Sequence, residues 1–458
     1  MKYFSTRDKT LNFDFKDIFL RGLAPDGGLF LPSNTKRYSA TEIETLGKLS
    51  YIDLATEIIS NFCDSNLDKI KLKLIIEKAY KNFDNREVVK IKKIGDVNLL
   101  ELYNGPTLAF KDIAMQVIGN MYDGLNLTED KVVNIVVATS GDTGSAAISA
   151  LNDRKNINVF VLHPHNKISN IQRRIMTTIA SKNIFNIAVK GTFDDCQKIV
   201  KDMFSENLFR EKINMSGVNS INWARIMCQI VYYFYAVLKF PNKKFNFSVP
   251  TGNFGDVYAG YVAKKMGLQI DKLIVATNEN DILQRVINTG VYKPSLVKPS
   301  LSPSMDIQIS SNFERLLFDI VNNDDKKVLT LMNSLKSQGF FKLSKKEIEK
   351  IKKDFSSFKA SDEETLNIIK KFESKYKFIL DPHTATAVSA SYKIKNNYDT
   401  IVLGTAHPYK FLETIKKATG KEVKPPRQFL NILEKKENFD ILNNQVSEIK
   451  KFILGKVA

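Results

Sequence analysis

The sequence is poor in cysteine and histidine. It contains three cysteines in 458 residues, and they lie far apart at positions 63, 196 and 228. An odd and widely spaced set of this kind supports neither a disulfide framework nor a Cys-x-x-Cys metal site. The four histidines leave little material for a zinc centre. We therefore expect no metal, and a location in the reducing cytoplasm.

Long hydrophobic runs are absent as well. The longest mostly apolar stretch, QIVYYFYAVLKF at residues 229–240, is too short to cross a bilayer. The N-terminal residues MKYFSTRDKTLNFDF include acidic side chains and no continuous apolar segment, so we predict neither a secretory nor a mitochondrial presequence. With 43% hydrophobic and 26% charged residues, the composition is typical of a globular protein without membrane contact.

Arginine is scarce although the chain is strongly basic. The net charge is +18, but only 12 of the 68 basic residues are arginines, and the lysines are dispersed. Many of them occupy helical surface stretches such as residues 342–355, whereas nucleic-acid binders usually gather basic residues on one stripe. We therefore expect no nucleic-acid partner. A diffuse positive field favours a small anionic substrate.

The middle of the chain alternates short apolar runs rich in β-branched residues with segments of helical period. Such runs are typical of parallel strands that are buried on both faces by helices. The sequence therefore predicts an α/β protein with parallel sheets. The runs lie at residues 132–139, 158–164, 185–191, 245–252, 272–278 and 400–408.

The length favours two or three domains. A turn-rich N-terminal region precedes the first strand–helix units, and a Pro/Ser-rich passage, KPSLVKPSLSPSMD, interrupts the alternation before a series of charged helices. We predict an N-terminal domain at 1–95, a two-lobed α/β core at 96–289 and 379–420, an inserted smaller helical lobe at 290–378, and a C-terminal helical tail at 421–458.

Two strand-to-helix turns are rich in small and polar residues: SGDTGS at 140–145 and TGNFGD at 251–256. Glycines let backbone N–H groups approach an anion closely at the positive end of a helix. Each turn also has a purely structural reading, because a tight strand-to-helix connection needs glycine. Neither loop matches the P-loop or the dinucleotide pattern, which leaves a smaller phosphate-bearing ligand.

A single lysine, Lys111, follows a Gly-Pro turn in LYNGPTLAFKDIAMQ and stands at the start of a predicted helix. A lysine in a partly apolar pocket has a depressed pKa and can act as a Schiff-base nucleophile. By residue chemistry alone, the simpler reading of a solvated lysine remains open, because the chain contains 56 lysines.

Five motifs, taken together, favour the functional reading of Lys111 over that of a solvated lysine. GPTLAFKD, ATSGDTGSA, NSINWAR, SVPTGNFGD and GTAHPYKF occur in this order, and the turn DGGLFLP precedes them. This set resembles the threonine synthases, which are pyridoxal-phosphate enzymes of fold type II, the fold of tryptophan synthase β. The resemblance extends over residues 22–415. It implies parallel sheets flanked by helices, with an N-terminal extension domain.

The resemblance also implies a cofactor, pyridoxal 5'-phosphate, and the residues that bind it. Lys111 would be the catalytic residue and would hold the cofactor covalently through its amine. Thr405 would hydrogen-bond the pyridine nitrogen. Asp142 stands near the place of the cofactor's phenolic oxygen, and since a carboxylate repels a phenolate, we expect its side chain to point away or to be protonated. The cofactor phosphate would be bound by Gly252, Asn253, Phe254, Gly255 and Asp256.

The substrate implied is O-phosphohomoserine, which water converts to threonine and phosphate by γ-elimination and β-addition. Ser140 and Thr143 would bind its carboxylate. Asn219, Ser220 and Arg225 would bind its phosphate, since a guanidinium offers a planar fork that suits phosphate oxygens. An ion pair on a helix surface is the alternative reading for Arg225.

Other functions remain open at this point. One is a related phospho-lyase, or a serine/threonine dehydratase, of the same fold. Another is a catalytically silent basic protein that binds nucleic acid. We assign no proton to His407, which we expect to shape the turn before Pro408. The sequence is compatible with a monomer or a homodimer.

Overall fold

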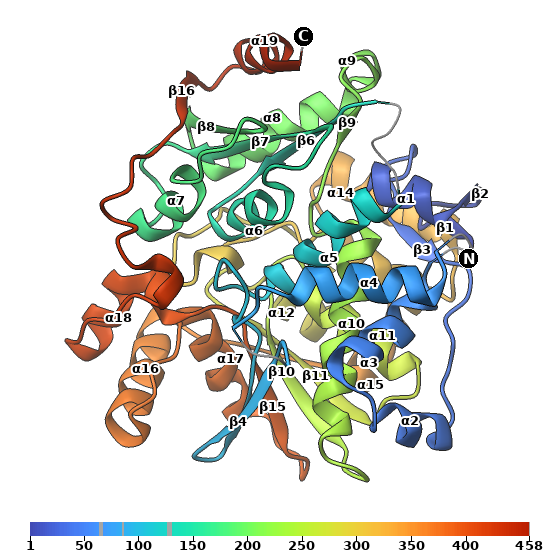
Figure 1. The fold of residues 1–458 in the computed structure, drawn as a ribbon. Coiled ribbons are helices and arrows are strands. Elements are labelled where there is room, and N and C mark those ends of the chain that lie inside the picture. The colour runs from blue at the N-terminus through green and yellow to red at the C-terminus, as the bar shows by residue number, and fades with distance from the viewer. Residues whose placement is uncertain (64–66, 85–86, 126–130, 458) are drawn as a thin grey trace.

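Two parallel sheets form the framework of the protein (Figure 1). The structure is a computed structural model and describes residues 1–63, 67–84, 87–125 and 131–457. The larger sheet has six strands and the smaller one has five. Helices lie between the two sheets and on their outer faces, so the predicted α/β class with parallel sheets is confirmed.

The six-stranded sheet is parallel except at one edge, where β4 runs antiparallel to β5. Both of its faces are buried. Leu99 and Ile274 pack with helices α16 and α17, whereas Leu100 and Val275 belong to the central core on the opposite face. Across the sheet the strands are β14 (Phe355–Lys359), β11 (Ile270–Thr277), β10 (Phe245–Pro250), β15 (Thr400–Gly404), β5 (Val97–Glu101) and β4 (Lys90–Ile94).

All neighbours in the five-stranded sheet are parallel. Val136 and Phe160 face an outer cluster formed with helices α8, α9 and α19, and Ile135 and Val137 face the central core. This two-sided burial explains why the strands read as continuous apolar runs. In order, they are β16 (Asp440–Asn443), β8 (Ile184–Lys190), β7 (Ile157–Pro164), β6 (Val133–Ala138) and β9 (Met215–Ser216).

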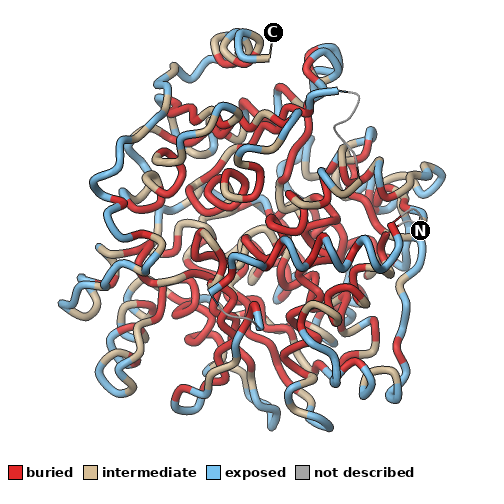
Figure 2. The backbone as a smooth tube through the Cα atoms, in the orientation of Figure 1, coloured by how far each residue is buried: buried red, intermediate tan, exposed pale blue. Residues whose placement is uncertain are grey.

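Helix α10 (Trp223–Leu238) lies in the centre of the molecule, and every residue from Trp223 to Val237 is buried (Figure 2). The long apolar stretch of the sequence is therefore a core helix. No helix among the described residues combines the length and apolar character that crossing a bilayer requires. Helix α10 packs against α3 (Tyr51–Ser60), α5 (Lys111–Gly124) and α11 (Gly255–Lys265). Helix α4 (Lys69–Tyr80) packs on α3 and α5, and α6 (Asp142–Leu151) packs on α5.

The N-terminal region carries a small antiparallel sheet whose core side chains join the central cluster. Phe19 packs edge-on against Tyr122, with ring centroids 5.0 Å apart. The expected domain limit at residue 95 falls inside the β4–β5 hairpin, because the alternating segment KIKKI pairs with the buried strand that follows. The elements before it are β1 (Tyr3–Ser5), β2 (Asp8–Phe13), α1 (Phe15–Arg21), β3 (Phe30–Pro32) and α2 (Ala40–Leu46).

Residues 290–378 are mostly helical, and they also contribute a strand to the larger sheet. Strand β14 completes the larger sheet beside β11, because FSSFK buries Phe355 and Ser357 there. The other elements of this region are β12 (Val291–Tyr292), η1 (Pro303–Met305), α13 (Phe313–Ile320), α14 (Asp325–Gln338), β13 (Phe341–Lys342), α15 (Lys345–Asp354) and α16 (Asp362–Tyr376).

The C-terminal segment differs from the expected helical tail, because its strand β16 pairs with β8 at the edge of the smaller sheet. Helix α19 (Val446–Val457) then buries Ile449 and Ile453 against that sheet. The remaining helices are α7 (Asn170–Thr177), α8 (Phe193–Ser205), α9 (Asn207–Lys212), α12 (Ile282–Thr289), α17 (Pro382–Lys393), η2 (Pro408–Phe411), α18 (Leu412–Thr419) and η3 (Arg427–Phe429).

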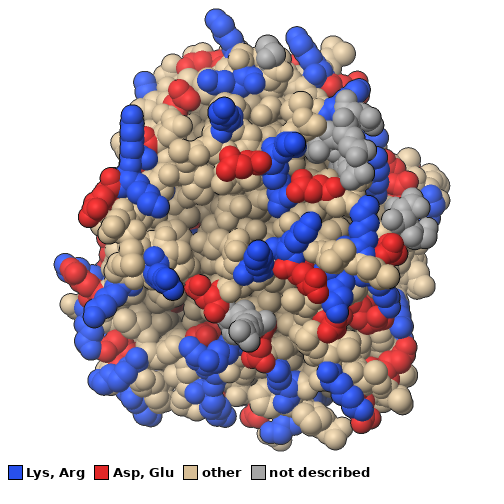
Figure 3. All heavy atoms as spheres, in the orientation of Figure 1, with Lys and Arg blue, Asp and Glu red and all other residues tan. Residues whose placement is uncertain are grey.

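Basic side chains are spread over the face of the molecule that Figure 3 shows, and acidic side chains lie among them. Many of the lysines form ion pairs, for example Lys73 with Asp53 at 2.7 Å and Lys244 with Asp271 at 2.7 Å. On this face the basic residues do not gather in one stripe, as the dispersed lysines of the sequence predict.

Candidate active site

The carboxyl ends of strands from both sheets meet at one large cavity of about 1760 Å³. The loops after β6, β10 and β15 contribute to its wall, as do the start of α5 and the segment before α10. The structure brings all the predicted site residues together there: Lys111, Ser140, Asp142, Thr143, Asn219, Ser220, Arg225, Gly252, Asn253, Phe254, Gly255, Asp256 and Thr405.

Lys111 is the first residue of α5, and its side chain is only 13% exposed. Its Nζ lies 3.4 Å from Asp142 Oδ2. Burial lowers the pKa of Lys111, the Asp142 carboxylate opposes that change, and the nearby cations Lys410 and Arg225 lower the pKa further. The amine therefore loses its proton more readily than a solvated lysine, as the sequence prediction for this residue requires.

The turn before Lys111 is fixed by the buried carboxylate of Asp112. This carboxylate accepts hydrogen bonds from the Thr107 backbone N–H at 2.8 Å and from the Thr107 hydroxyl at 2.6 Å. Gly105 must be a glycine here, because a Cβ at this position would come within 2.5 Å of the Asp112 side chain. The motif GPTLAFKD thus builds a rigid turn that sets the position of Lys111.

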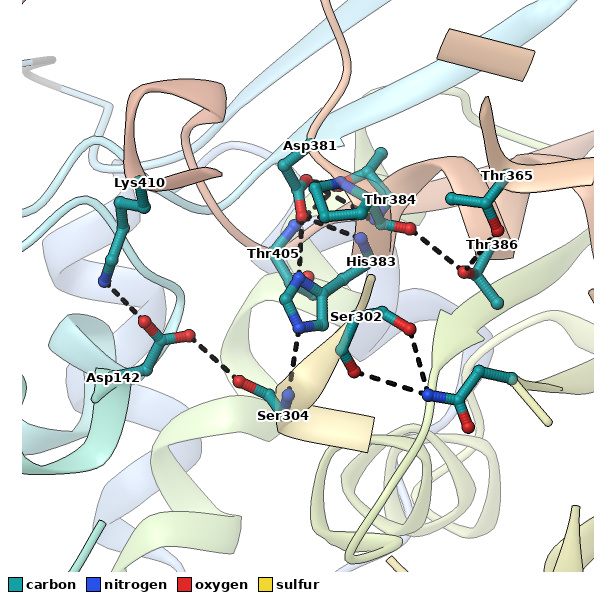
Figure 4. A network of polar contacts seen from close by, with 12 residues as sticks. Asp142, Ser302, Ser304, Thr365, Asp381, His383, Thr384, Thr386, Thr405 and Lys410 are labelled. Atoms are coloured by element: carbon teal, nitrogen blue, oxygen red, sulfur yellow. Dashed lines mark hydrogen bonds and ion pairs between the residues drawn. The ribbon is translucent and has the colours of Figure 1, made fainter. Parts of the chain in front are cut away.

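Asp142 is the electrostatic centre of the site (Figure 4). Its Oδ1 accepts from Lys410 Nζ at 2.6 Å and from Gln172 Nε2 at 2.9 Å, and its Oδ2 accepts from Ser304 Oγ at 3.2 Å. Burial alone would raise the pKa of Asp142, but the charges of Lys410 and Lys111 outweigh burial and hold this pKa well below its usual range.

In this structure the Asp142 carboxylate faces Lys111 and Lys410, which favour its ionised form. The side chain points into the cluster and carries a negative charge that the two lysines balance. The reasoning from sequence did not include Lys410, which is fully buried and also donates to the Thr107 carbonyl at 3.0 Å. The signal was a lysine between two aromatic residues in GTAHPYKF, where a solvated lysine is out of place.

The loop after β10 has the form of an anion cup at the N-terminus of α11. Phe254 adopts a left-handed conformation, with φ of 65°, and packs its ring edge-on against Phe313. Gly252 lies against the Ser304 carbonyl, which a Cβ would approach to 2.8 Å. Such a turn directs backbone N–H groups toward the space before the helix, where the helix dipole also favours an anion.

The Asp256 side chain is held by two tyrosines of α10 and does not take part in this anion site. Its Oδ1 accepts from the hydroxyls of Tyr232 at 2.5 Å and Tyr233 at 2.9 Å. Burial raises the pKa of Asp256 to about 6, although the two tyrosines oppose that shift. Of the five predicted loop residues, Asp256 can therefore offer an anion only its backbone, while its carboxyl group ties α11 to α10.

Arg225 lies in the first turn of α10 and is buried, so the surface ion-pair reading is wrong. Its Nη1 donates to the Val218 carbonyl at 3.1 Å, and its Nε has no partner among the described residues. No carboxylate in the described part of the chain lies within ion-pair distance of it. Burial lowers the pKa of Arg225 to about 10, so the group is still cationic at neutral pH.

The loop after β6 is organised by a residue that the sequence analysis did not single out. Thr139 Oγ1 accepts from the N–H groups of Gly141 and Gly144, each at 2.9 Å. Gly141 has a φ of 129°, and a Cβ there would meet the Gln172 side chain at 2.8 Å. Ser140 and Thr143 then line the cavity on either side of Asp142.

Two histidines stand near the end of β15. His407 Nδ1 accepts from the Tyr409 N–H at 3.1 Å, and burial lowers the pKa of His407 to about 4. Its predicted role in the turn is confirmed. His383, which the sequence analysis did not mention, lines the cavity and pairs with Asp381 at 2.9 Å, and Thr384 links the same carboxylate to the Thr405 N–H (Figure 4).

Replacement of Asp142 by asparagine tests the importance of this cluster. We expect Asp142→Asn to lower the free energy of unfolding by about 3–5 kcal/mol, because Lys410 would be left buried without a counter-charge. The matched control is Glu422→Gln, which breaks the exposed Lys416–Glu422 pair and should cost less than about 1 kcal/mol. Urea denaturation of both variants measures the difference, and equal losses of stability would contradict the account.

Comparison with known proteins extends over the whole chain. The model of the family described as "Pyridoxal-phosphate dependent enzyme" matches residues 92–403. The model "Threonine synthase N terminus" matches residues 2–80, and "Threonine synthase, C-terminal" matches residues 384–453. Together the three matches include the cavity and the small sheet at the N-terminus.

Individual relatives agree with these matches. The chain is 42% identical to a threonine synthase of Pseudomonas aeruginosa, with 99% of this chain and 98% of the relative covered. It is 42% identical to a threonine synthase of Saccharomyces cerevisiae, with 97% of each covered. The solved structure of pyridoxal-phosphate-bound threonine synthase from Brucella melitensis superposes with a TM-score of 0.95 at 42% identity, covering 100% of this chain and 99% of that one. The chain therefore belongs to the threonine synthase family of pyridoxal-phosphate-dependent enzymes.

Proposed function

We propose that this protein converts O-phosphohomoserine and water to L-threonine and phosphate. The observation that carries the proposal is the content of the cavity, which holds one amine of lowered pKa, Lys111, and one buried guanidinium without a carboxylate partner, Arg225. The first suits a covalent link to an aldehyde, and the second suits a phosphate. Full-length membership of the family supports the same reaction.

The residues present fit pyridoxal 5'-phosphate. Lys111 would hold it through Nζ, because its lowered pKa makes the amine available as a nucleophile. The backbone N–H groups of the loop formed by Gly252, Asn253, Phe254, Gly255 and Asp256 would bind the phosphate, and Thr405 would meet the pyridine nitrogen. A hydroxyl at Thr405 does not force the ring to stay protonated as a carboxylate would.

When bound, the cofactor supplies an electron sink that stabilises negative charge on the carbons next to the substrate's amino group. Lys111 Nζ would then move protons at Cα, Cβ and Cγ of the substrate, because an amine with a lowered pKa can act as base and acid in turn. Phosphate would leave from Cγ, and water would add at Cβ.

The substrate would be held at both of its charged ends. Ser140 and Thr143, beside Asp142, would bind the carboxylate with hydroxyl and backbone groups. Asn219, Ser220 and Arg225 would bind the phosphate. Support for the second subsite is the charge of Arg225, whose desolvated guanidinium gains more from an anion than a solvated one does.

Asp142 would balance the positive charges of Lys111 and Lys410. It would not contact an anion directly. With two lysines bound to its carboxylate, it offsets positive charge that would otherwise make Lys111 still harder to protonate. Lys410 would neutralise Asp142 in turn, so that the negative charge does not repel the cofactor's phenolic oxygen. The Asp142–Lys410 pair would thereby reduce the repulsion between a carboxylate and a phenolate that we expect from the sequence.

We also propose that the protein works in the cytoplasm on a small anionic amino acid, as a monomer or a homodimer. Buried positions for Cys63, Cys196 and Cys228 suit a reducing compartment. The net charge of +18, spread over the whole sequence, suits attraction of anions in general and no particular macromolecule.

The direct test is an assay with the cofactor-loaded protein and O-phosphohomoserine. We expect threonine and phosphate to form in equal amounts, because the same cavity completes both elimination and water addition. Serine and threonine serve as control substrates and should give no oxo acid. Release of phosphate without threonine would contradict the proposal and favour a phospho-lyase.

Replacement of Arg225 tests the phosphate subsite. We expect Arg225→Met to raise KM for O-phosphohomoserine by an amount that corresponds to about 2–5 kcal/mol, because a buried charge pair with the substrate is lost. Arg225→Lys should recover part of the loss, since a lysine keeps the charge without the fork. The control Arg427→Met changes an exposed arginine and should leave KM unchanged. An unaltered KM in Arg225→Met would place the phosphate elsewhere.

A further inference from the structure

The cavity wall contains a buried acid–histidine pair that the proposed function does not use: Asp381 and His383, at the start of α17. The Asp381 side chain caps this helix and accepts from the backbone N–H groups of His383 and Thr384. Asp381 is 1% exposed and His383 is 3% exposed, yet His383 is part of the cavity lining. Burial of a carboxyl group and an imidazole costs free energy unless both have hydrogen-bond partners. The partners of this pair therefore indicate what it does.

The contacts of His383 define its tautomer. Its Nε2 lies 3.2 Å from the backbone nitrogen of Ser304, which can only donate. Nε2 must therefore accept and carry no proton, so the proton of the neutral ring is on Nδ1. From there it is donated to Asp381 Oδ1 at 2.9 Å. His407 has the opposite arrangement, because its Nδ1 accepts from the Tyr409 N–H.

Ser304 connects the histidine to the rest of the site (Figure 4). Its hydroxyl donates to Asp142 Oδ2 at 3.2 Å, the oxygen that also faces Lys111. Its carbonyl lies against Gly252 in the loop after β10. One residue of the short helix η1 thus contacts the buried carboxylate, the histidine and the glycine loop.

The other side of the pair leads to the end of β15. The Thr384 hydroxyl donates to Asp381 Oδ2 and accepts from the Thr405 N–H at 3.2 Å. Thr405 is the residue proposed to meet the cofactor's ring nitrogen. A continuous chain of hydrogen bonds therefore runs from Thr405 to Asp142 through Asp381, His383 and Ser304.

We propose that His383 is a positioning residue, which Asp381 holds as the Nδ1–H tautomer so that Nε2 fixes Ser304 against Asp142. Only a neutral imidazole in this tautomer satisfies the donor at Ser304 and the acceptor at Asp381 together. An apolar residue would leave both unpaired in a buried place. The kinetic consequence rests on the proposed function, because it is through Asp142 that Ser304 sets the surroundings of Lys111.

The tautomer can be read by NMR of protein labelled with 15N in the histidine rings, with and without cofactor. The chain has four histidines, so single substitutions assign the signals. We expect His383 with a protonated Nδ1 and a bare Nε2, and His407 with the reverse. Asp381→Leu, which removes the acceptor for the Nδ1 proton, should reduce the Nδ1–H form of His383 and leave His407 unchanged. A protonated Nε2 on His383 in the unaltered protein would overturn the proposal.

Kinetics test the consequence. His383→Leu removes the acceptor, and we expect kcat to fall on the order of tenfold to a hundredfold with little change in KM. His383→Gln can present a carbonyl oxygen to the Ser304 N–H and should retain most of kcat, and Ser304→Ala should lower kcat as His383→Leu does. The control His165→Leu changes a histidine outside the cavity and should have no effect.

The two arms separate the possible failures. Equal kcat values for His383→Leu and the unaltered protein would refute the positioning role even if the tautomer is as described. If the unaltered protein makes no threonine, the proposed function fails, while the NMR result still decides whether Asp381 holds His383 in the Nδ1–H form. If Leu and Gln variants lose kcat equally while both bind cofactor as tightly as the unaltered protein, the hydrogen bond to Ser304 is not the cause and the proposal is wrong.

Discussion

The buried carboxylate of Asp142 is the constraint on which the arrangement of the site depends. Four elements contribute donors to it: α5 through Lys111, α7 through Gln172, η1 through Ser304 and η2 through Lys410. An ionised carboxylate at this depth is unfavourable unless paired charges and hydrogen bonds surround it. These donors come from segments far apart in the chain. The hydrogen bonds and ion pairs to Asp142 therefore hold elements of both sheets around one cavity.

This convergence also explains how one cavity can serve several chemical tasks. Parallel strands direct their carboxyl ends, and the helix N-termini that follow, to one side of each sheet. The two sheets oppose these ends across the cavity, so the glycine-rich loop after β10, a lysine of lowered pKa and a desolvated arginine face the same space. The small N-terminal sheet packs into the same core, where Tyr3 contacts Trp223 of α10.

Sequence reasoning reached the fold class because that class depends on local patterns, and the resemblance carried by five ordered motifs pointed to residues that the structure places around one cavity. Apolar runs show parallel strands, and ordered motifs show loops at their ends. It missed what depends on packing between distant segments. Lys410 contacts Asp142 and Thr107, and His383 contacts Ser304, all more than 75 residues away in the chain. Residue spacing in the sequence cannot predict such contacts. Strands β4, β14 and β16 were missed because edge strands are short and rich in polar residues.

Two lysines, Lys111 and the fully buried Lys410, bind the Asp142 carboxylate, and we assign the cofactor to Lys111. Reduction of the cofactor-loaded protein with borohydride, followed by peptide mapping, distinguishes the two. We predict that the modified residue is Lys111, which faces the cavity, and that Lys410 is unmodified, because Lys410 is fully buried and engaged by Asp142 and Thr107. Modification of Lys410, or of any lysine outside the cavity, would contradict the account.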